Sequence, residues 1–284
     1  MIAQEFEYTA PQGLAEALTL VANGAKPLAG GMSLIPMMKL RLAAPDHLVD
    51  MGRIPELKYI REEGSRIRIG AMSTHFELQT SPVLLRACAV LAKTAAQIGD
   101  VQVRNTGTIG GSIAHADPAA DYPAALMALE ADVRLVSASG ERTLPISEFL
   151  LDSFTTAIDP GEIIAEIIVP ADDSRTGTAY VKIAQAASGF ALVGVAARVR
   201  KDGGKISLCR VGITGAGPIG YRASGVEIAL EGKSGTSDEI AQAAAAASEG
   251  VQMNSDLNAS AEYRAHLARV CTARAIRAAL AELG

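Results

Sequence analysis

The sequence contains no tryptophan, and only 4% of its 284 residues are aromatic. A surface that stacks nucleic-acid bases needs aromatic side chains, so this composition argues against single-strand binding. Basic residues are not clustered either: the net charge is −5 and no basic block interrupts the chain. Nucleic acids and anionic membrane surfaces both attract clustered Lys and Arg, so neither is an expected partner.

Cysteine is also scarce. Cys88, Cys209 and Cys271 lie far apart, and no Cys-x-x-Cys pair occurs. The chain therefore offers no cysteine set for a zinc ribbon or an iron–sulfur cluster, and buried thiols in a reducing compartment are the simpler interpretation. The four histidines show no metal-binding spacing such as H-E-x-x-H. We expect no metal site in this chain.

Long apolar runs are absent as well, because none reaches the roughly 18 residues that a membrane span needs. The first ten residues include Glu5 and Glu7 and lack the basic start and apolar centre of a signal peptide. We therefore expect a cytoplasmic protein.

Two patterns of secondary structure follow one another along the chain. Through residue 174, strands mix with helices, and after a polar segment at 171–177 three strands precede three helices. Strands followed by helices are typical of an α+β domain with an antiparallel sheet. We expect a domain at 1–174, with subdomains of about 1–55 and 56–174, and a second domain at 175–284. The expected elements are helices at 14–22, after Pro36 and at 82–98, 119–129, 224–230, 238–248 and 261–283; strands at 27–29, 47–51, 57–61, 66–71, 132–137, 142–145, 163–169, 179–184, 191–200 and 206–214; and a glycine-rich loop at 106–112.

The first candidate ligand-binding segment is Ala29-Gly30-Gly31-Met32-Ser33, directly after a short strand. Adjacent glycines let the backbone turn sharply and approach a ligand, because no Cβ intervenes. Successive N–H groups in such a turn bind anions, and Ser33 adds a hydroxyl. Taken alone, the motif is more often a plain strand–turn–helix junction.

The second segment is Thr108-Ile109-Gly110-Gly111-Ser112, followed by Asp117 and Asp121 near the start of the next helix. Each aspartate could cap that helix or hold a ribose diol. Two glycine turns of one style suit a ligand with two phosphates better than either turn does alone.

Together with Leu34-Ile-Pro36 and His115-Ala-Asp-Pro-Ala-Ala-Asp121, these motifs resemble the FAD-binding medium subunits of molybdenum hydroxylases. That family includes carbon monoxide dehydrogenase medium chains and the flavin domain of xanthine dehydrogenase. The resemblance covers essentially the full chain, in order and at the family's spacing. It implies an α+β fold: a two-part FAD-binding domain of the vanillyl-alcohol-oxidase (PCMH) type, then a domain of the CO dehydrogenase flavoprotein type with a three-stranded antiparallel sheet and helices.

The resemblance also implies roles for particular residues. Residues 29–33 and 108–112 would wrap the diphosphate of FAD, Asp121 would lie near the adenosine half, and Ile164 and Lys182 would line the flavin side. On residue type alone, Lys182 would be a strand lysine that extends to water. The implied cofactor residues are Ala29, Gly30, Gly31, Met32, Ser33, Thr108, Ile109, Gly110, Gly111, Ser112, Asp121, Ile164 and Lys182.

The sequence departs from the family in two places. Met32 stands where His or Gln is common, which removes a polar side chain from the first loop. Residues 183–185 (Ile-Ala-Gln) stand where an arginine pair often follows the lysine. These differences bear on the contacts to the flavin ring.

The activity implied by the resemblance is electron transfer within a larger oxidoreductase. A large subunit with a molybdenum cofactor would oxidise the substrate, and a small subunit with two [2Fe–2S] clusters would relay electrons to FAD in this chain. FAD would then reduce an external acceptor, the complex being a dimer of heterotrimers. The flavin supplies the redox chemistry, so no catalytic residue is expected here.

Two other interpretations stay open at this point. The segment Gly215-Ala-Gly-Pro-Ile-Gly220 matches G-x-G-x-x-G, the signature of an NAD-binding Rossmann dehydrogenase. Pro218 counts against it, and so does the polar segment at 231–237, which leads into another helix where a second parallel strand ending in Asp or Glu would be needed. A scaffold subunit that has lost its flavin is the other. His115 could be a general base, but nothing in the sequence pairs it with a nucleophile.

Overall fold

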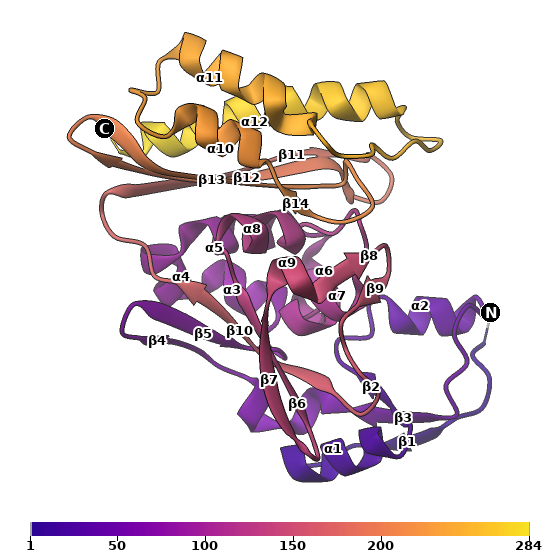
Figure 1. The fold of residues 1–284 in the computed structure, drawn as a ribbon. Coiled ribbons are helices and arrows are strands. Elements are labelled where there is room, and N and C mark those ends of the chain that lie inside the picture. The colour runs from indigo at the N-terminus through magenta and orange to yellow at the C-terminus, as the bar shows by residue number, and fades with distance from the viewer. Residues whose placement is uncertain (1, 284) are drawn as a thin grey trace.

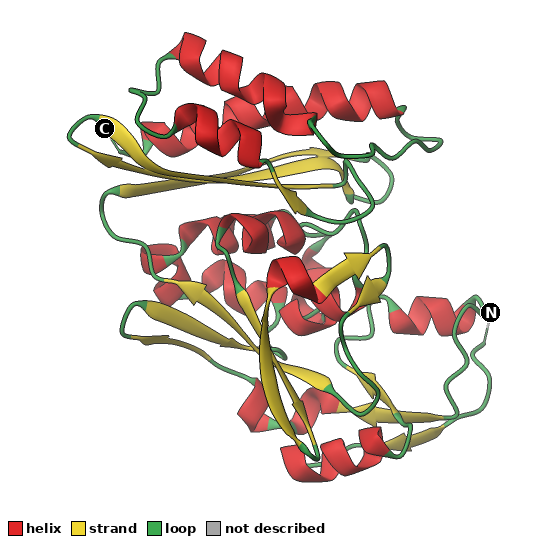
Figure 2. Ribbon diagram, viewed as in Figure 1, coloured by secondary structure: helices red, strands yellow, loops and turns green. Residues whose placement is uncertain are grey.

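The computed structural model describes residues 2–283. Its helices and strands lie in layers (Figures 1 and 2): a small α/β unit from the N-terminus at one end, a five-stranded sheet, a layer of helices, a second sheet, and a helical layer from the C-terminus at the other end. No helix within 2–283 is both long and apolar enough to cross a membrane.

The N-terminal unit has a three-stranded parallel sheet in the order β1 (Glu7–Thr9), β3 (His47–Asp50), β2 (Lys26–Leu28). Helix α1 (Leu14–Ala22) has the predicted bounds and buries one apolar face. The core of this unit is completed by residues from the neighbouring five-stranded sheet, because strands of residues 132–170 contribute buried side chains to it. The two parts therefore share a core instead of packing independently.

Helix α2 (Leu34–Lys39) starts earlier than the predicted position after Pro36. Proline is tolerated in the first helical turn, where its missing N–H has no intrahelical acceptor. The helix therefore begins one residue after Ser33, directly behind the first glycine motif.

The five-stranded antiparallel sheet has the order β4-β5-β10-β6-β7. Its central strand is the predicted apolar run, which is buried from Ile163 to Val169. The strands predicted at 57–61 and 66–71 pair as an antiparallel hairpin, in which the first strand begins at Ile60. The bounds are Ile60–Glu63 for β4, Arg66–Gly70 for β5, Asp132–Ser137 for β6, Gly140–Pro145 for β7 and Ile163–Pro170 for β10.

Short helices cover one face of this sheet and enclose the main hydrophobic core. They are α3 (His75–Thr80), α4 (Pro82–Ala87), α5 (Ala89–Ala96), α6 (Val101–Thr106), α7 (Ile109–His115), α8 (Tyr122–Ala128) and α9 (Ile146–Phe149). Two 3-10 turns, Met51–Arg53 and Pro55–Leu57, and the small hairpin of β8 (Leu150–Asp152) and β9 (Thr155–Thr156) complete this half.

The prediction of one long helix over 82–98 is wrong. The helix is interrupted at Cys88, whose backbone has φ −162° and ψ 57°. Through this break the carbonyl of Ala87 accepts a hydrogen bond of 2.7 Å from the N–H of Asp172, in the segment that joins the two halves of the chain. A tertiary hydrogen bond thus replaces an intrahelical one, which apolar periodicity alone does not reveal.

The C-terminal half contains an antiparallel sheet in sequence order, β11 (Thr176–Ala184), β12 (Ala191–Asp202), β13 (Lys205–Thr214) and β14 (Tyr221–Arg222). The sheet therefore has four strands and not the expected three. The additional strand, β14, has only two residues, which is too short to show an alternating pattern in the sequence. Gly203 and Gly204 have φ of 57° and 80°, as the tight turn between β12 and β13 requires.

Helices pack on both faces of this second sheet. Helices α10 (Ser224–Leu230) and α12 (Ala261–Ala281) pack on the outer face, and α11 (Ser237–Ala244) packs on these two helices. Helices α5 and α8 of the first half lie against the inner face. A short 3-10 turn, Ala245–Ser248, follows α11. The segment 215–220 connects β13 to β14 without a helix, so it lacks the strand–turn–helix geometry of a Rossmann site.

Candidate cofactor site

The two glycine motifs lie in direct contact. A Cβ added to Gly30 would lie 2.0 Å from the carbonyl oxygen of Thr106 and 2.7 Å from the Cα of Gly107. A Cβ added to Gly111 would lie 3.4 Å from the Cβ of Ala29. The structure therefore brings together two segments far apart in the sequence, as a shared ligand requires.

The first motif presents free hydrogen-bond donors. Gly31 has φ +70°, which turns the chain between β2 and α2. Within residues 2–283, the N–H groups of residues 30–33 donate to no backbone acceptor. Ser33 occupies the N-cap position of α2, but its hydroxyl makes no capping bond. Consecutive unpaired N–H groups at a helix start form an anion-binding site, so these residues fit a phosphate.

The second motif is a helix start and not the predicted loop. Thr108 caps α7, and the N–H groups of residues 109–112 donate, in order, to the carbonyl of Ser73, the carbonyl of Ala71, the hydroxyl of Thr108 and the carbonyl of Thr108. The distances lie between 2.9 and 3.1 Å. Because these donors are already paired, the backbone of residues 109–112 cannot bind phosphate in this conformation.

Gly110 explains the close approach of this helix to the five-stranded sheet. A Cβ at Gly110 would lie 2.5 Å from the Cβ of Ala71 and 2.7 Å from its carbonyl oxygen. Gly111, in contrast, would meet only the flexible Thr108 hydroxyl, at 2.9 Å, and Ala29. Gly110 is thus required by packing, whereas Gly111 faces the first motif.

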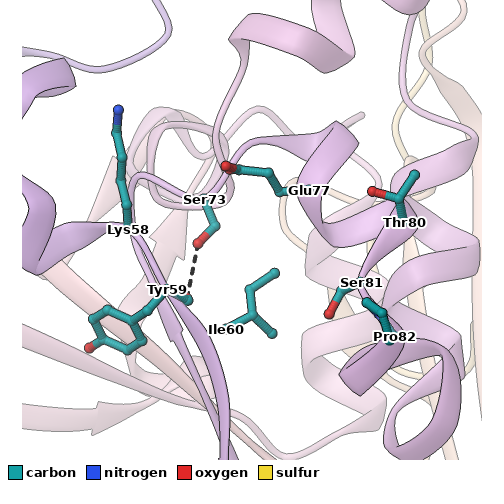
Figure 3. A pocket seen from close by; sticks show the side chains of 8 residues that line it. All are labelled: Lys58, Tyr59, Ile60, Ser73, Glu77, Thr80, Ser81 and Pro82. Atoms are coloured by element: carbon teal, nitrogen blue, oxygen red, sulfur yellow. Dashed lines mark hydrogen bonds between the residues drawn. The ribbon is translucent and has the colours of Figure 1, made fainter.

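A cavity of about 220 Å³ opens where the two motifs meet. Among the predicted residues, Ala29, Gly30 and Thr108 line it. A second cavity of about 300 Å³ lies next to it and shares Lys58 and Glu77 with it (Figure 3). The other residues around the first cavity are Gly52, Met72, Thr74, Asn105 and Thr106; those around the second are Tyr59, Ile60, Ser73, Thr80, Ser81 and Pro82.

Lys58, Thr74 and Glu77 were missed by the sequence prediction. Thr74 forms a full capping box with Glu77, whose carboxylate accepts the Thr74 N–H at 2.7 Å. The spacing Thr-x-x-Glu before an apolar run is a recognisable signal for this arrangement. Lys58 donates to the carbonyl of Gly52 at 2.5 Å, and nothing in its local sequence indicates that it lines a cavity.

Asp121 and Lys182 meet each other away from these cavities. Lys182 Nζ lies 2.9 Å from both carboxylate oxygens of Asp121, and the side chains are 3% and 5% exposed. The interpretation of Lys182 as a lysine that extends to water is therefore wrong, and Asp121 makes no capping bond to α8. Burial raises the pKa of the Asp121 carboxyl, and the charge of Lys182 opposes that rise.

Ile164 and Met32 have different surroundings. Ile164 lies on β10 with 7% exposure and packs into the main hydrophobic core, and it lines neither of the two cavities. Met32 is 42% exposed, on the loop before α2. In this conformation Ile164 is therefore a core residue, while Met32 can contact a ligand or another chain.

The three cysteines are free and buried. Burial raises the pKa of all three thiols, to about 12 for Cys209, so they remain protonated at neutral pH. Across residues 2–283, no group of three or more His, Cys, Asp or Glu side chains is arranged to hold a metal ion.

Comparisons with known proteins give the family. Residues 4–172 match the family model "FAD binding domain in molybdopterin dehydrogenase", and residues 178–279 match "CO dehydrogenase flavoprotein C-terminal domain". The chain is 42% identical to the carbon monoxide dehydrogenase medium chain of Hydrogenophaga pseudoflava, covering 99% of each chain. The chain belongs to the FAD-binding medium chains of the molybdenum hydroxylases.

Other members of the family show how widely the fold is shared. The glyceraldehyde dehydrogenase medium chain of Sulfolobus acidocaldarius is 35% identical, covering 98% of this chain and 99% of that one. The solved carbon monoxide dehydrogenase of Hydrogenophaga pseudoflava superposes with a TM-score of 0.96 at 43% identity, covering 100% of each chain. Quinoline 2-oxidoreductase from Pseudomonas putida 86 superposes with a TM-score of 0.94 at 31% identity, also covering 100% of each chain. As a medium chain, this protein is an FAD-binding subunit of an oxidoreductase complex.

Proposed function

We propose that this chain carries FAD as the electron-transfer subunit of a molybdenum-containing hydroxylase. In this proposal, electrons come from two [2Fe–2S] clusters of a small partner subunit, and FAD passes them to an external acceptor. Substrate is oxidised by a large subunit that holds the molybdenum cofactor. The observation that carries the proposal is the contact between the two glycine motifs, with free N–H donors on the first.

The chain's own residues bind and orient the cofactor. We assign residues 30–33 to the diphosphate, through backbone N–H groups and the Ser33 hydroxyl, with Ala29 forming the adjacent wall. We assign residues 108–112 to the same site as the surface against which the first loop is held. Ile164 and Lys182 are assigned to the flavin side. Asp121 is assigned to the same end of the cofactor and not to the adenosine half, because its carboxylate lies 2.9 Å from the Lys182 ammonium and one ion pair cannot reach both ends of FAD.

We propose a domain division at residues 174 and 175, and subdomains of about 1–55 and 56–174 within the first domain. The separate hydrophobic core formed by the second sheet and helices α10–α12 supports the main division. We further propose a dimer of heterotrimers in the cytoplasm; the unpaired cysteines are consistent with a reducing compartment.

The names of the relatives indicate a shared role with different substrates. They include carbon monoxide, glyceraldehyde, nicotine and caffeine dehydrogenases or hydroxylases. If substrate is bound by the large subunit, one medium-chain fold can serve all of these reactions. The retained first loop also favours a flavin-binding subunit over a scaffold that has lost its flavin.

The proposal is tested by titrating the purified chain with FAD and, as the matched control ligand, FMN. FAD should bind with quenching of its fluorescence, and FMN, which lacks the second phosphate and the adenosine, should bind at least tenfold more weakly. Equal affinity for the two flavins would contradict the role of residues 30–33. Absence of any flavin binding would favour the scaffold. Copurification from the native host should recover subunits that contain molybdenum and iron.

A further inference from the structure

A buried polar cluster joins the two halves of the chain at Asp121, Tyr180 and Lys182. Tyr180, on β11, donates its hydroxyl to Asp121 Oδ1 at 2.5 Å. Lys182, two residues further on the same strand, pairs with the same carboxylate and also donates to the carbonyl of Gln97 at 3.0 Å. The amide of Gln97 returns a hydrogen bond of 3.3 Å to the carbonyl of Tyr180. The cluster therefore links α8 and the end of α5 to the second sheet.

The cluster is removed from water. Tyr180 is 6% exposed and Asp121 4%. A buried carboxylate keeps its charge only when it has enough partners, and Tyr180 and Lys182 are the two side chains that supply them here. Because the carboxylate makes no capping bond, its contacts are those of this cluster.

Gly194 provides the space that the Tyr180 hydroxyl occupies. Gly194 lies on β12 opposite Lys182, and a Cβ there would lie 2.3 Å from the hydroxyl oxygen of Tyr180. Glycine weakens a strand interior, so its presence at a buried position in β12 needs a reason such as close approach of another group. The hydroxyl of Tyr180 supplies that reason.

We propose that Tyr180 is a positioning residue of the cofactor site. Its hydroxyl fixes the carboxylate of Asp121, and the carboxylate fixes the ammonium of Lys182. This inference rests on the proposed roles of Asp121 and Lys182 toward FAD. It adds Tyr180 to the cofactor site as a residue that acts through this pair and is not predicted to touch the cofactor.

The test is Tyr180→Phe, which keeps the ring and removes the hydroxyl. We expect FAD binding to weaken about tenfold, the range for loss of one hydrogen bond to a charged group. The midpoint potential of the bound flavin should fall, because Asp121 with one donor fewer draws the Lys182 ammonium toward itself and away from the flavin. The matched control is Tyr221→Phe, since Tyr221 donates to a backbone carbonyl, that of Ala247, at 3.0 Å in the second half of the chain. Tyr221→Phe should lower the melting temperature about as much as Tyr180→Phe does, because each loses one tyrosine hydrogen bond. It should leave the FAD affinity and the flavin midpoint potential unchanged.

A double variant decides whether Tyr180 acts through the pair. In the Lys182→Met background, adding Tyr180→Phe should leave the flavin potential where Lys182→Met alone puts it. A further shift of equal size would overturn the inference, as would unchanged FAD affinity and potential in Tyr180→Phe. Failure of the proposed function itself is recognised separately, because the unmodified chain would then bind no FAD.

Discussion

The two glycine motifs, residues 29–33 and 108–112, have similar sequences but different roles in the structure. In residues 29–33 the turn leaves consecutive N–H groups unpaired and the Ser33 hydroxyl free. In residues 108–112 every N–H from Ile109 onward is paired within the chain, and Thr108 caps a helix. The first motif is therefore suited to binding an anion, while the second holds the first in place. Similar glycine patterns do not imply similar contacts with a ligand.

The contact between the motifs is the strongest test of this comparison. In Gly30→Ala, the new Cβ would overlap the carbonyl oxygen of Thr106, at 2.0 Å, so one of the two loops must shift. We expect loss of detectable FAD binding and a melting temperature several degrees lower, as measured by flavin fluorescence and circular dichroism.

Gly13→Ala is the control for this change. A Cβ at Gly13 would meet only the Glu56 carboxylate, at 3.9 Å, and its backbone is extended, with φ −143°. Normal FAD binding by Gly30→Ala would show that the two motifs do not need to touch.

The chain should lose stability at low pH because the buried His75 ring packs beside the second motif. The His75 ring is buried against Gly107, and its Nδ1 lies 3.0 Å from the Tyr122 hydroxyl. Burial lowers the pKa of His75 from 6.5 to about 4. The unfolded chain thus binds this proton more readily, so stability is full above pH 6.5 and falls as the pH drops toward 4, by about 3 kcal/mol in total.

Urea unfolding at several pH values, compared between the natural chain and His75→Gln, measures this effect. The difference in the free energy of unfolding between the two chains should shrink between pH 6.5 and 4. A constant difference would mean that His75 does not titrate in this range.

The smallest expected effects come from removing the hydroxyls of Thr108 and Ser33, and they should differ between the two motifs. Thr108→Val removes the N-cap of α7, and we expect the free energy of unfolding to fall by about 1 kcal/mol. Ser33→Ala removes a hydroxyl that caps nothing, so the stability of the flavin-free chain should be unchanged while FAD binding weakens several-fold. Denaturant unfolding and FAD titration of both variants measure these outcomes, and the comparison fails if the two variants behave alike.

The sequence predicted those features that depend on local pattern. Helix α1 and the apolar strand β10 follow from the periodicity of their apolar residues. The different roles of the two motifs could not be predicted, because the acceptors for residues 109 and 110 come from Ser73 and Ala71 in a distant segment.

The candidate site shows the same limit. The family pattern points to the two glycine motifs, and they lie in contact in the fold. The pairing of Asp121 with Lys182 depends on how the second sheet packs on α8, and no local signal encodes that packing. Tyr180 was missed for the same reason.

The break between α4 and α5 has a mechanical consequence for the whole chain. The carbonyl of Ala87, which the break leaves without an intrahelical donor, accepts the N–H of Asp172. The carboxylate of Asp172 accepts a hydrogen bond of 2.6 Å from Arg198 on β12. The N–H of Ala171 is likewise held by the carbonyl of Ser65. A connection between domains is ordinarily where a protein bends and where proteases cut. Here the connection is hydrogen-bonded to both halves of the chain, so we expect the two halves to move together and the peptide between them to resist cleavage.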